Sequence, residues 1–257
     1  MKDQLFAASK DYGISALGIT RHESNTAIVC LFAYPSVPNE NANLSLYTYG
    51  VDYHTVIGDI LCAFGERFFP HDFSVHVDIG EPIDRKLAYN AGLGFYGKNG
   101  MLIHPQLGSF FFIGWIETSV FIPEDTPLSA KCLGCNACFH ACPGNALSDA
   151  GLDTSKCSSA ISQKKGKLSK EEEAILMKSG LCFGCDACQL VCPHNQHIET
   201  TYLPQFSENC ISHLSLAEIM PLSNREFKEK YKDRAFSWRG KSVVLRNLEI
   251  ISKETQE

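Results

Sequence analysis

Apolar residues in the first half of the chain recur with two periods, one typical of helices and one typical of strands. Between Tyr53 and Phe69 they return every three or four positions, which predicts a helix with one apolar face. Two more helices are expected at residues 2–12 and 81–91. Short runs rich in β-branched and aromatic residues predict buried strands at residues 14–19, 26–33, 74–77, 101–103 and 109–118. Residues 1–127 should therefore form a mixed α/β layer.

The middle of the chain carries one cysteine pattern twice. The first copy runs from Cys132 to Pro143 and the second from Cys182 to Pro193, each as C-x2-C-x2-C-x3-C-P. Bacterial ferredoxins use this run to hold two 4Fe–4S clusters, and the fourth cysteine of each run ligates the other cluster. A disulfide framework would not need two copies of one spacing that each end in proline. The pattern predicts a ferredoxin-like double-cluster domain over residues 128–200.

The same rule divides the thiolates between the two clusters. For the first cluster it predicts Cys132, Cys135, Cys138 and Cys192. For the second it predicts Cys142, Cys185 and Cys188 together with a fourth ligand, which a plain ferredoxin would take from Cys182.

Residues 201–257 are expected to form a helical, basic C-terminal segment, so that the predicted fold class is α+β. Residues 225–246 hold eight cations against three acids, which is 8 − 3 = +5 in a chain whose formal net charge is −6. One interpretation is a solvated helical face. The other is a surface that contacts the phosphates of a nucleic acid or of a nucleotide-bearing cofactor. The cations are Arg225, Lys228, Lys230, Lys232, Arg234, Arg239, Lys241 and Arg246.

Composition and charge limit the class of protein and the cellular compartment that we expect. The 257 residues are 44% hydrophobic, which is typical of a globular chain, and the negative net charge argues against coating nucleic acid by bulk charge. No apolar run approaches the roughly 18 residues of a membrane span, and the N-terminus lacks the apolar core of a signal peptide. Twelve cysteines with metal-ligand spacing then point to the reducing cytoplasm. We expect a cytoplasmic monomer that does not associate with membranes.

Two clusters alone can only transfer electrons, and the segments on either side of the cysteines are longer than a ferredoxin needs for that purpose. The simplest use of the additional chain is a second redox centre that receives the electrons. Several motifs bear on its identity: Tyr47-x-x-Gly50-x-Asp52-Tyr53-His54, Val77-Asp78 with Asp84-Arg85, Ala91 to Asn99 leading to Gly108-Ser109-Phe-Phe-Phe, Leu152 to Ser159, and Gly184 to Asn195.

In combination these motifs resemble the epoxyqueuosine reductase family, and the resemblance spans about Lys2 to Asn247. That family is cobalamin-dependent and reduces the epoxide of epoxyqueuosine in the tRNA anticodon loop to give queuosine. The resemblance implies that cobalamin sits between the α/β layer and the cluster domain, where the two clusters reduce its cobalt. It also implies partners, namely the tRNA anticodon loop or a smaller queuosine precursor, and an electron donor such as ferredoxin or flavodoxin.

The resemblance places the family's general acid on Asp78. A carboxyl at a strand end in an apolar pocket has its charged form disfavoured, so that it could carry a proton near neutral pH. The alternative role for Asp78 is a helix N-cap before Pro82. Asp52 and His54 are expected to be hydrogen-bond partners at a helix start rather than ligands.

Other site residues are also implied by the resemblance. It takes the fourth ligand of the second cluster from Cys157, within Leu-Asp-Thr-Ser-Lys-Cys, and leaves Cys182 as the alternative. Lys98 and Asn99 lie in a Gly-rich loop that could meet cobalamin, although a plain turn explains them nearly as well. Tyr49 stands where the family often has Arg. The expected cofactor-binding residues are Tyr49, Lys98, Asn99, Leu102, Ser158 and Ser159.

The usual member of the family continues into a C-terminal helical-repeat domain that helps to hold tRNA, whereas this chain ends at Glu257. The sequence therefore predicts a short form. Two alternative functions stay open: a related corrinoid-dependent reductase that acts on another small substrate, and a double-cluster electron-transfer protein.

Overall fold

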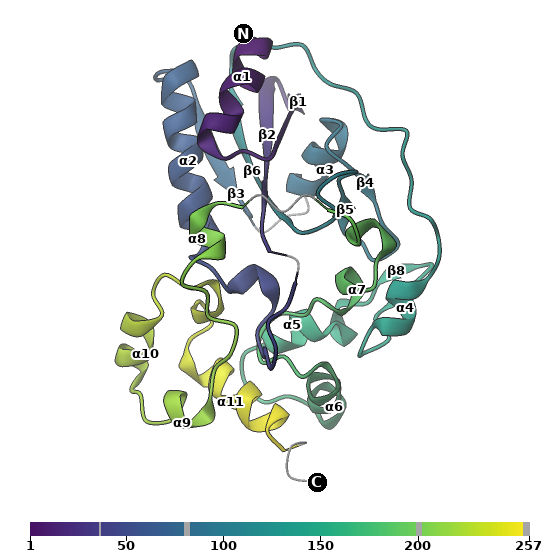
Figure 1. The fold of residues 1–257 in the computed structure, drawn as a ribbon, viewed down its shortest axis with the longest axis vertical. Helices are drawn as coiled ribbons and strands as arrows, with labels where there is room; N and C mark the ends of the chain where they lie inside the picture. Colours follow the sequence, from purple (N-terminus) through teal and green to yellow (C-terminus); the bar gives the residue numbers. More distant parts are fainter. Residues whose placement is uncertain (36, 80–82, 199–201, 254–257) are drawn as a thin grey trace.

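The computed structural model describes residues 1–35, 37–79, 83–198 and 202–253, and its centre is a four-stranded antiparallel sheet (Figure 1). The strand order is β1-β2-β6-β3, and the register sets Cys30 of β2 opposite Leu17 of β1 and Gly114 of β6. The strands are β1 (Ala16–His22), β2 (Asn25–Ala33), β3 (Ser74–Val77) and β6 (Phe111–Thr118).

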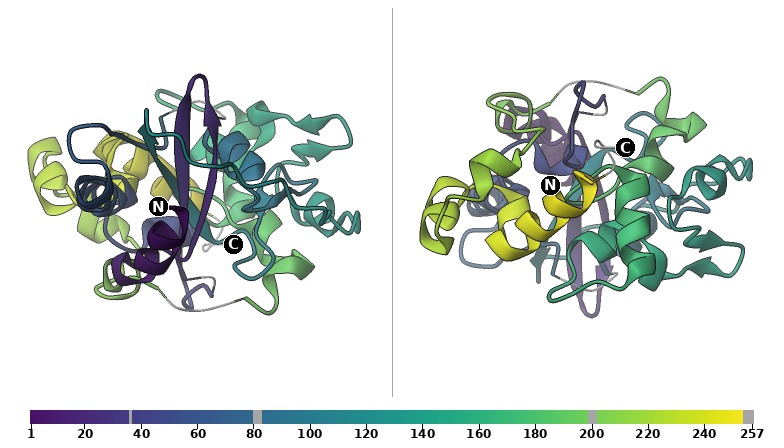
Figure 2. Two further views of the ribbon diagram at one scale, coloured as in Figure 1. Left: turned by 90° about the horizontal axis from the view of Figure 1, so that it is seen from above. Right: turned by 90° about the horizontal axis from the view of Figure 1, so that it is seen from below.

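Helices cover both faces of this sheet, because β2 carries apolar side chains on both sides. Ile28 and Phe32 share one core cluster with side chains of α1 (Lys2–Ser9) and α2 (Tyr53–Phe68). Val29, which alternates with them, packs in a second cluster with α3 (Ile83–Asn90). Seen from above in Figure 2, the sheet accordingly stands between α1 and α2 on one side and α3 on the other. A strand buried on both faces explains the continuous apolar run in the sequence.

The predicted α+β class is confirmed, and most predicted elements of the first layer are found within two residues. The predicted strand 109–118 begins at Phe111, and the predicted helix 81–91 is described from Ile83, because Glu81 and Pro82 lie outside the described residues. One interpretation was wrong. The Gly-rich stretch taken as a plain loop contains β4 (Phe95–Tyr96), which pairs with β5 (Leu102–Ile103) in a separate small sheet.

An extended segment carries the chain from the sheet to the first cysteine run. Residues 119–136 contain no helix or strand and run along the outside of the molecule in Figure 1. Asp125 fastens this segment, since its carboxylate accepts hydrogen bonds from Lys2 Nζ at 2.7 Å and from the Ile19 amide at 2.9 Å.

The cysteine segment consists of short elements. Each cysteine run contributes one short helix, α4 from the first and α7 from the second, and these two helices pack against each other. The elements are α4 (Ala137–Ala141), β7 (Leu147–Ser148), β8 (Gly151–Leu152), α5 (Ser158–Ser162), α6 (Lys170–Ser179) and α7 (Ala187–Leu190), with 3-10 turns at Thr154–Lys156 and Pro193–Asn195.

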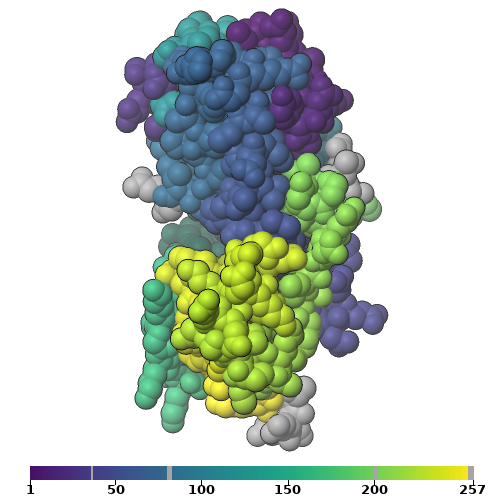
Figure 3. Space-filling view, turned by 90° about the vertical axis from the view of Figure 1, so that its left-hand side faces the viewer, coloured from purple at the N-terminus to yellow at the C-terminus, as the bar shows by residue number. Residues whose placement is uncertain are grey.

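The C-terminal segment is helical, as expected, and α11 packs against α6 and α9. Residues 199–201, at the predicted border between the second and third segments, lie outside the described residues. The elements are α8 (Pro204–Ser207), α9 (Leu216–Ile219), α10 (Asn224–Lys230) and α11 (Lys241–Ile251), with a 3-10 turn at Ala235–Ser237. In Figure 3 the yellow-green and yellow residues of α9, α10 and α11 lie at the front of the lower half of the molecule, below the blue residues that include α2.

One continuous core joins the N-terminal layer to the segments below it. Leu5 of α1, Phe183 of the second cysteine run and Leu248 of α11 belong to the same buried cluster. The connection runs through residues 43–52, where Leu44 forms a β-bridge to Phe183. Two 3-10 turns complete the N-terminal layer, at Lys10–Tyr12 and Leu46–Thr48. Across the described ranges, the helices are all too short or too polar to span a bilayer.

Candidate active site

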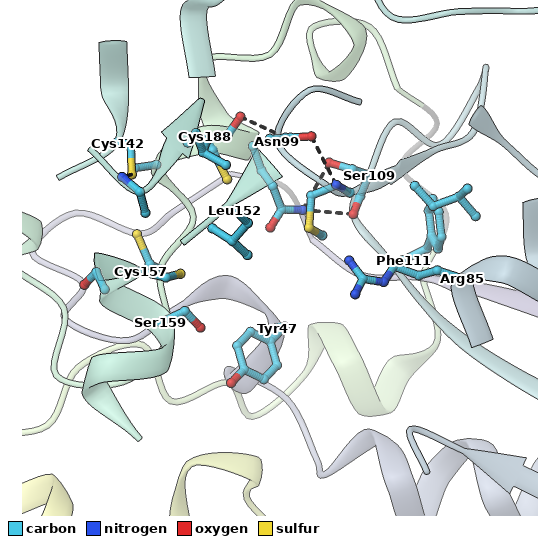
Figure 4. A pocket seen from close by; sticks show the side chains of 18 of the residues that line it. Tyr47, Arg85, Asn99, Ser109, Phe111, Cys142, Leu152, Cys157, Ser159 and Cys188 are labelled. Carbon is cyan, nitrogen blue, oxygen red and sulfur yellow. Dashed lines mark hydrogen bonds between the residues drawn. The ribbon is translucent and has the colours of Figure 1, made fainter. Parts of the chain in front are cut away.

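A cavity of about 600 Å³ lies where the sheet layer meets the cysteine segment. Figure 4 shows cysteine side chains on one side of it and Arg85 and Phe111 on the other. Its volume is within the range of sites that hold small molecules and cofactors.

Four cysteines from three different places in the sequence line this cavity, namely Cys142, Cys157, Cys185 and Cys188. Burial raises the pKa of Cys185 to about 11 and that of Cys188 to about 12, and neighbouring thiolates raise both further. These two groups are therefore thiols in the metal-free protein, and a metal must displace their protons. The arrangement brings the four predicted ligands of the second cluster to one wall.

Cys182, the alternative fourth ligand, lies elsewhere. It is fully buried in the main core, its Sγ is 3.9 Å from Asn43 Oδ1, and its amide donates to the Asn43 carbonyl. Neither cavity includes it among its lining residues.

The predicted ligands of the first cluster meet at a second, smaller cavity, which is lined by Cys132, Cys135, Cys138 and Cys192. In the described part of the chain, no three His, Cys, Asp or Glu side chains converge on a position for a single metal ion. A cubane binds each thiolate through a different iron, so its ligands surround the cluster instead of meeting at one point.

Asp78 directly follows β3 and also lines the larger cavity. Its carboxylate accepts a hydrogen bond from the Tyr53 hydroxyl and lies 3.8 Å from His54 Nε2. The expected apolar surroundings are not found, because 55% of the side chain is exposed. The pocket rim near Asp78 is polar, and this corrects the burial argument made from the sequence.

The partners of Asp78 have defined protonation. Burial, and after it the charge of Asp78, raises the pKa of Tyr53, so that its hydroxyl remains a donor at neutral pH. A hydrogen bond to Asp52 raises the pKa of His54. Asp52 also caps α2, because its carboxylate accepts from the His54 amide at 3.1 Å. The expectation that Asp52 and His54 are partners at a helix start is confirmed.

Packed aromatic rings line the same cavity as Asp78. The Tyr53 ring stacks on Phe112 with centroids 4.3 Å apart and planes 8° apart, and the centroid of the Tyr34 ring lies 4.6 Å from that of Phe112. Burial raises the pKa of Tyr34 and of Tyr47, which also lines the cavity. These rings give the cavity rigid apolar walls with hydroxyl groups that stay protonated.

A polar network ties the sheet to the second cysteine run beside the cavity. Gln189 Nε2 donates to the Ser109 carbonyl at 2.9 Å, and Asn195 Nδ2 donates to Ser109 Oγ at 3.0 Å. In return the Ser109 amide donates to Asn195 Oδ1 at 2.8 Å. Gly108 must lack a side chain here, because a Cβ would overlap Asn195. The network fixes how the two walls face each other.

The structure brings four of the six predicted cofactor-binding residues to the cavity: Asn99, Leu102, Ser158 and Ser159. The Ser158 hydroxyl is informative, since the residue is 2% exposed and this group has no hydrogen-bond partner in the described part of the chain. A buried hydroxyl without a partner is costly, and a bound ligand would satisfy it.

The other two residues lie outside the cavity lining. Tyr49 is buried in the main core, and its carbonyl accepts a hydrogen bond from Arg234. Lys98 lines the smaller cavity beside the first set of cysteines. The sequence had suggested a contact between each of them and the cofactor, and the geometry does not bring them there.

Several cavity residues were not predicted as site residues. Asp84 is buried, accepts a hydrogen bond from Trp115 Nε1 at 2.7 Å, and has a pKa raised by burial. Arg85 donates to the Gly100 carbonyl at 2.6 Å. Tyr47, Tyr53, Asp84 and Arg85 all belong to the motifs described above, so the motifs could have indicated that these residues line the site. For Gln189 the sequence offered no such indication apart from its position in the second cysteine run.

Most cations of the basic C-terminal segment form hydrogen bonds or ion pairs with other residues of the chain. Arg246 donates to the Lys164 and Gly166 carbonyls at 2.7 and 2.5 Å, and Lys241 donates to the Met220 carbonyl at 2.9 Å. Lys230 and Lys232 form ion pairs with Glu218 and Glu229, at 2.6 and 2.8 Å. The cations therefore do not all face solvent as unpaired charges, and the phosphate-contacting interpretation stays a prediction. Among the described residues of this segment, Arg225, Lys228 and Arg239 have neither an ion pair nor a side-chain hydrogen bond, and the Arg239 guanidinium lies 3.6 Å from the centroid of the Trp238 ring.

Comparison with known proteins agrees with this arrangement. Residues 131–195 match the family "4Fe-4S double cluster binding domain". The epoxyqueuosine reductase of Listeria monocytogenes is 35% identical over 245 residues, which cover 89% of this chain and 64% of that protein. The epoxyqueuosine reductase of Lactococcus garvieae is 33% identical over 244 residues, covering 90% and 69%.

A solved structure of similar fold is that of an epoxyqueuosine reductase with an epoxyqueuosine-modified tRNA-Tyr stem loop. It superposes with a TM-score of 0.86 at 25% identity and covers 97% of this chain and 80% of that chain. The chain thus spans about two thirds of the length of these two curated relatives.

Proposed function

Because this chain belongs to the epoxyqueuosine reductase family, we propose that it is a cobalamin-dependent iron–sulfur reductase that converts epoxyqueuosine to queuosine in tRNA. One observation carries the proposal. A single cavity is lined both by four cysteines and by Asp78. Such a cavity can receive electrons through a cluster bound by the cysteines and a proton from the carboxyl of Asp78.

The two cysteine sets supply the electron path. We assign Cys132, Cys135, Cys138 and Cys192 to the first cluster and Cys142, Cys157, Cys185 and Cys188 to the second. Support comes from the two cavities that these sets line and from the family match over residues 131–195. The second set faces the larger cavity, so electrons would pass from the first cluster through the second. A low-potential carrier such as ferredoxin or flavodoxin would supply them.

The residues present fit cobalamin. The cavity is large and mainly apolar, and its buried Ser158 hydroxyl lacks a partner. Ser158, Ser159, Asn99 and Leu102 would hold the cofactor. When bound there, cobalamin would supply redox chemistry at its cobalt for the reduction of the substrate.

Removal of the epoxide oxygen as water consumes two electrons and two protons. We assign Asp78 the transfer of a proton from its carboxyl to the leaving oxygen. The hydroxyl of Tyr53 orients this carboxyl through their hydrogen bond, and His54 lies 3.8 Å from Oδ2 on the exposed side, where it could return a proton from solvent.

The substrate is proposed to be the tRNA anticodon loop, with a smaller queuosine precursor as the alternative. The relative that was solved with an epoxyqueuosine-modified stem loop supports tRNA. The half-exposed position of Asp78 also suits a nucleotide that enters from a macromolecule. We place the reaction in the cytoplasm, where thiols stay reduced, and expect a monomer.

The test is reduction of an epoxyqueuosine-modified stem loop by protein that has been reconstituted anaerobically with iron, sulfide and cobalamin. Mass spectrometry of the nucleosides should show queuosine formed in stoichiometric excess over enzyme. Cobalamin binding without queuosine would overturn the substrate and favour a corrinoid-dependent reductase of another compound. Two loaded clusters without cobalamin binding would instead favour an electron-transfer protein.

A further inference from the structure

We propose that Lys98 is a positioning residue for electron entry: it holds a fixed positive charge beside the first cluster and thereby raises that cluster's reduction potential. This inference rests on the ligand set proposed above for the first cluster, and it does not depend on the substrate. It gives a role to a residue that the sequence had suggested for cobalamin.

The position of Lys98 is unusual because it comes from the sheet layer and not from the cysteine segment. It follows β4 in the Gly-rich stretch, yet it lines the smaller cavity together with the four cysteines of the first set. Of the described residues that line this cavity, Lys98 is the sole Lys, Arg, Asp or Glu.

Three contacts fix the ammonium group in this place. Lys98 Nζ donates to Asn136 Oδ1 at 3.0 Å and to Asp149 Oδ1 at 2.7 Å, and it lies 5.4 Å from the centroid of the Phe139 ring. Asn136 stands between Cys135 and Cys138 with a φ of 60°, so the contact reaches into the ligand loop itself. The side chain is 35% exposed, whereas that of Asp149 is 80% exposed.

Electrostatics then gives the direction of the effect. Each one-electron reduction adds one negative charge to a cluster that is already anionic through its thiolates. A cation held nearby stabilises the reduced state more than the oxidised state, and net charge is one of the determinants of cluster potential. The pKa of Lys98 is raised, first by its hydrogen bond with Asp149 and further by the charges of Cys132 and Cys138. Asp149 partly offsets the cation.

The experiment is an anaerobic redox titration of the full chain carrying both clusters, followed by electron paramagnetic resonance. Lys98→Met should lower the ratio of reduced to oxidised first cluster about tenfold at a given potential, which is a shift of about 59 mV to more negative values. The second cluster should shift less. Lys98→Arg keeps the charge and should restore the potential.

Asp149→Asn supplies a test of opposite sign. Removal of this exposed anion leaves the cation less compensated, so the potential of the first cluster should become more positive. Lys131→Met, which removes an exposed cation next to Cys132, is the matched control and should have a smaller effect because solvent screens that charge.

Two results would overturn the proposal. One is an unchanged potential in Lys98→Met with full iron content. The other is a negative shift in Asp149→Asn, which would indicate disturbance of the ligand loop instead of a charge effect. Should Lys98→Met fail to load iron, the sign of the Asp149→Asn shift still decides. Since no turnover is measured, failure here leaves the proposed function standing, and inactivity toward epoxyqueuosine leaves this result standing.

Discussion

Asp78 holds its carboxylate at the cavity in a backbone conformation that few residues adopt. Its φ is 46°, in the left-handed region where Asp is one of the better-tolerated side chains. The Tyr53 hydroxyl then fixes the direction of the carboxylate, and Tyr53 itself is fixed by stacking on Phe112. The reactive position is therefore set by backbone and hydrogen bonding, with little contribution from burial.

Replacing Asp78 should remove proton donation while leaving the cavity intact. For Asp78→Asn we expect turnover to fall by roughly 10² or more, the usual scale for a general acid. Iron and cobalamin content should stay at wild-type levels, since the side chain contacts the rim. Asp59→Asn, an exposed acid on α2, serves as the matched control and should keep full activity. Loss of cofactor from Asp78→Asn would show a structural role instead.

The ion pair of His54 with Asp52 predicts a pH-dependent contribution to stability. The pKa of His54 is raised above its ordinary 6.5, so its contribution is complete below that value and is lost as the pH rises through the folded-state pKa. Partial burial opposes the effect on Asp52, but hydrogen bonds from His54 lower its pKa overall, and its contribution is lost as the pH falls through that lowered value.

His54→Gln should therefore destabilise the reconstituted protein between about pH 4 and 6.5 and have less effect near pH 8.5. Since both groups are partly exposed, we expect a difference of about 0.2–1 kcal/mol. Thermal unfolding midpoints of the two proteins across this pH range provide the measurement. A larger effect at pH 8.5 than at pH 5 would contradict the assignment.

At the scale of elements, the two cysteine runs have the same sequence pattern but not the same surroundings. Gly134 and Gly184 occupy equivalent places, with φ of 70° and 75°. A Cβ on Gly134 would meet no atom of the described residues within 4 Å, whereas a Cβ on Gly184 would overlap the side chain of Ser45. The second run is thus pressed against the N-terminal layer, and the first is free of it at this point.

This difference allows a matched pair of substitutions. Gly134→Ala should cost only the strain of a left-handed backbone, about 1 kcal/mol. Gly184→Ala carries the same strain together with the clash at Ser45, so its thermal midpoint should fall clearly further, with loss of iron from the second cluster. Equal effects of the two substitutions would show that the contact with Ser45 is not a constraint.

Cys157 and Cys182, the two candidates for the fourth ligand of the second cluster, also differ in their surroundings. Cys157 is placed at the cavity by the turn Thr154–Lys156 and begins α5, whereas Cys182 is held in the core beside Asn43. We expect Cys157→Ser to lose about half of the iron, because one of two equal clusters would go. Cys182→Ser should keep its iron. Iron analysis after anaerobic reconstitution provides the measurement, and the reverse outcome would restore the plain ferredoxin arrangement.

Much of the layered fold could be predicted because its signals are local. The helical spacing over α2 and the continuous apolar run of β2 each report burial along one element. The pairing of β4 with β5 could not be predicted, since two-residue strands carry no period. Spacing alone also could not separate Cys157 from Cys182, because the difference lies in the burial of Cys182 beside Asn43, a residue far away in the sequence.

The candidate site was predicted unevenly for a similar reason. Motif residues such as Asp78 and Ser158 reach the cavity as expected. Lys98 lines the smaller cavity and not the larger one. The sequence shows a basic residue in a Gly-rich loop but not which set of cysteines that loop faces. The exposure of Asp78 depends on how the layers meet, which no local pattern encodes.

At the scale of the whole molecule, several charged side chains form hydrogen bonds that connect one segment of the chain to another. Arg234 of the C-terminal segment donates to the Tyr49 carbonyl at 3.0 Å, and Arg246 bridges to residues 164–166 of the cysteine segment. Asp186, buried with a pKa raised by burial, accepts hydrogen bonds from Ser45 Oγ at 2.6 Å and the Leu46 amide at 2.8 Å. The cavity exists because these contacts hold the three segments together.

The structure distinguishes two kinds of cation that look alike in the sequence: those bonded within the molecule and those exposed to solvent. Arg246 is committed to backbone carbonyls, so Arg246→Gln should lower the thermal midpoint and leave the salt dependence of stem-loop binding unchanged. Lys228 is exposed on α10 and, in the described structure, has no ion-pair partner, so it is available to a phosphate. Lys228→Gln should keep the midpoint and reduce the slope of log affinity against log salt by about one. Binding of an epoxyqueuosine-modified stem loop at several salt concentrations measures both. If Arg246→Gln changes the slope and Lys228→Gln does not, then tRNA approaches the molecule from the side of α11 and the cysteine segment, and the internal contacts of Arg246 must open when it binds.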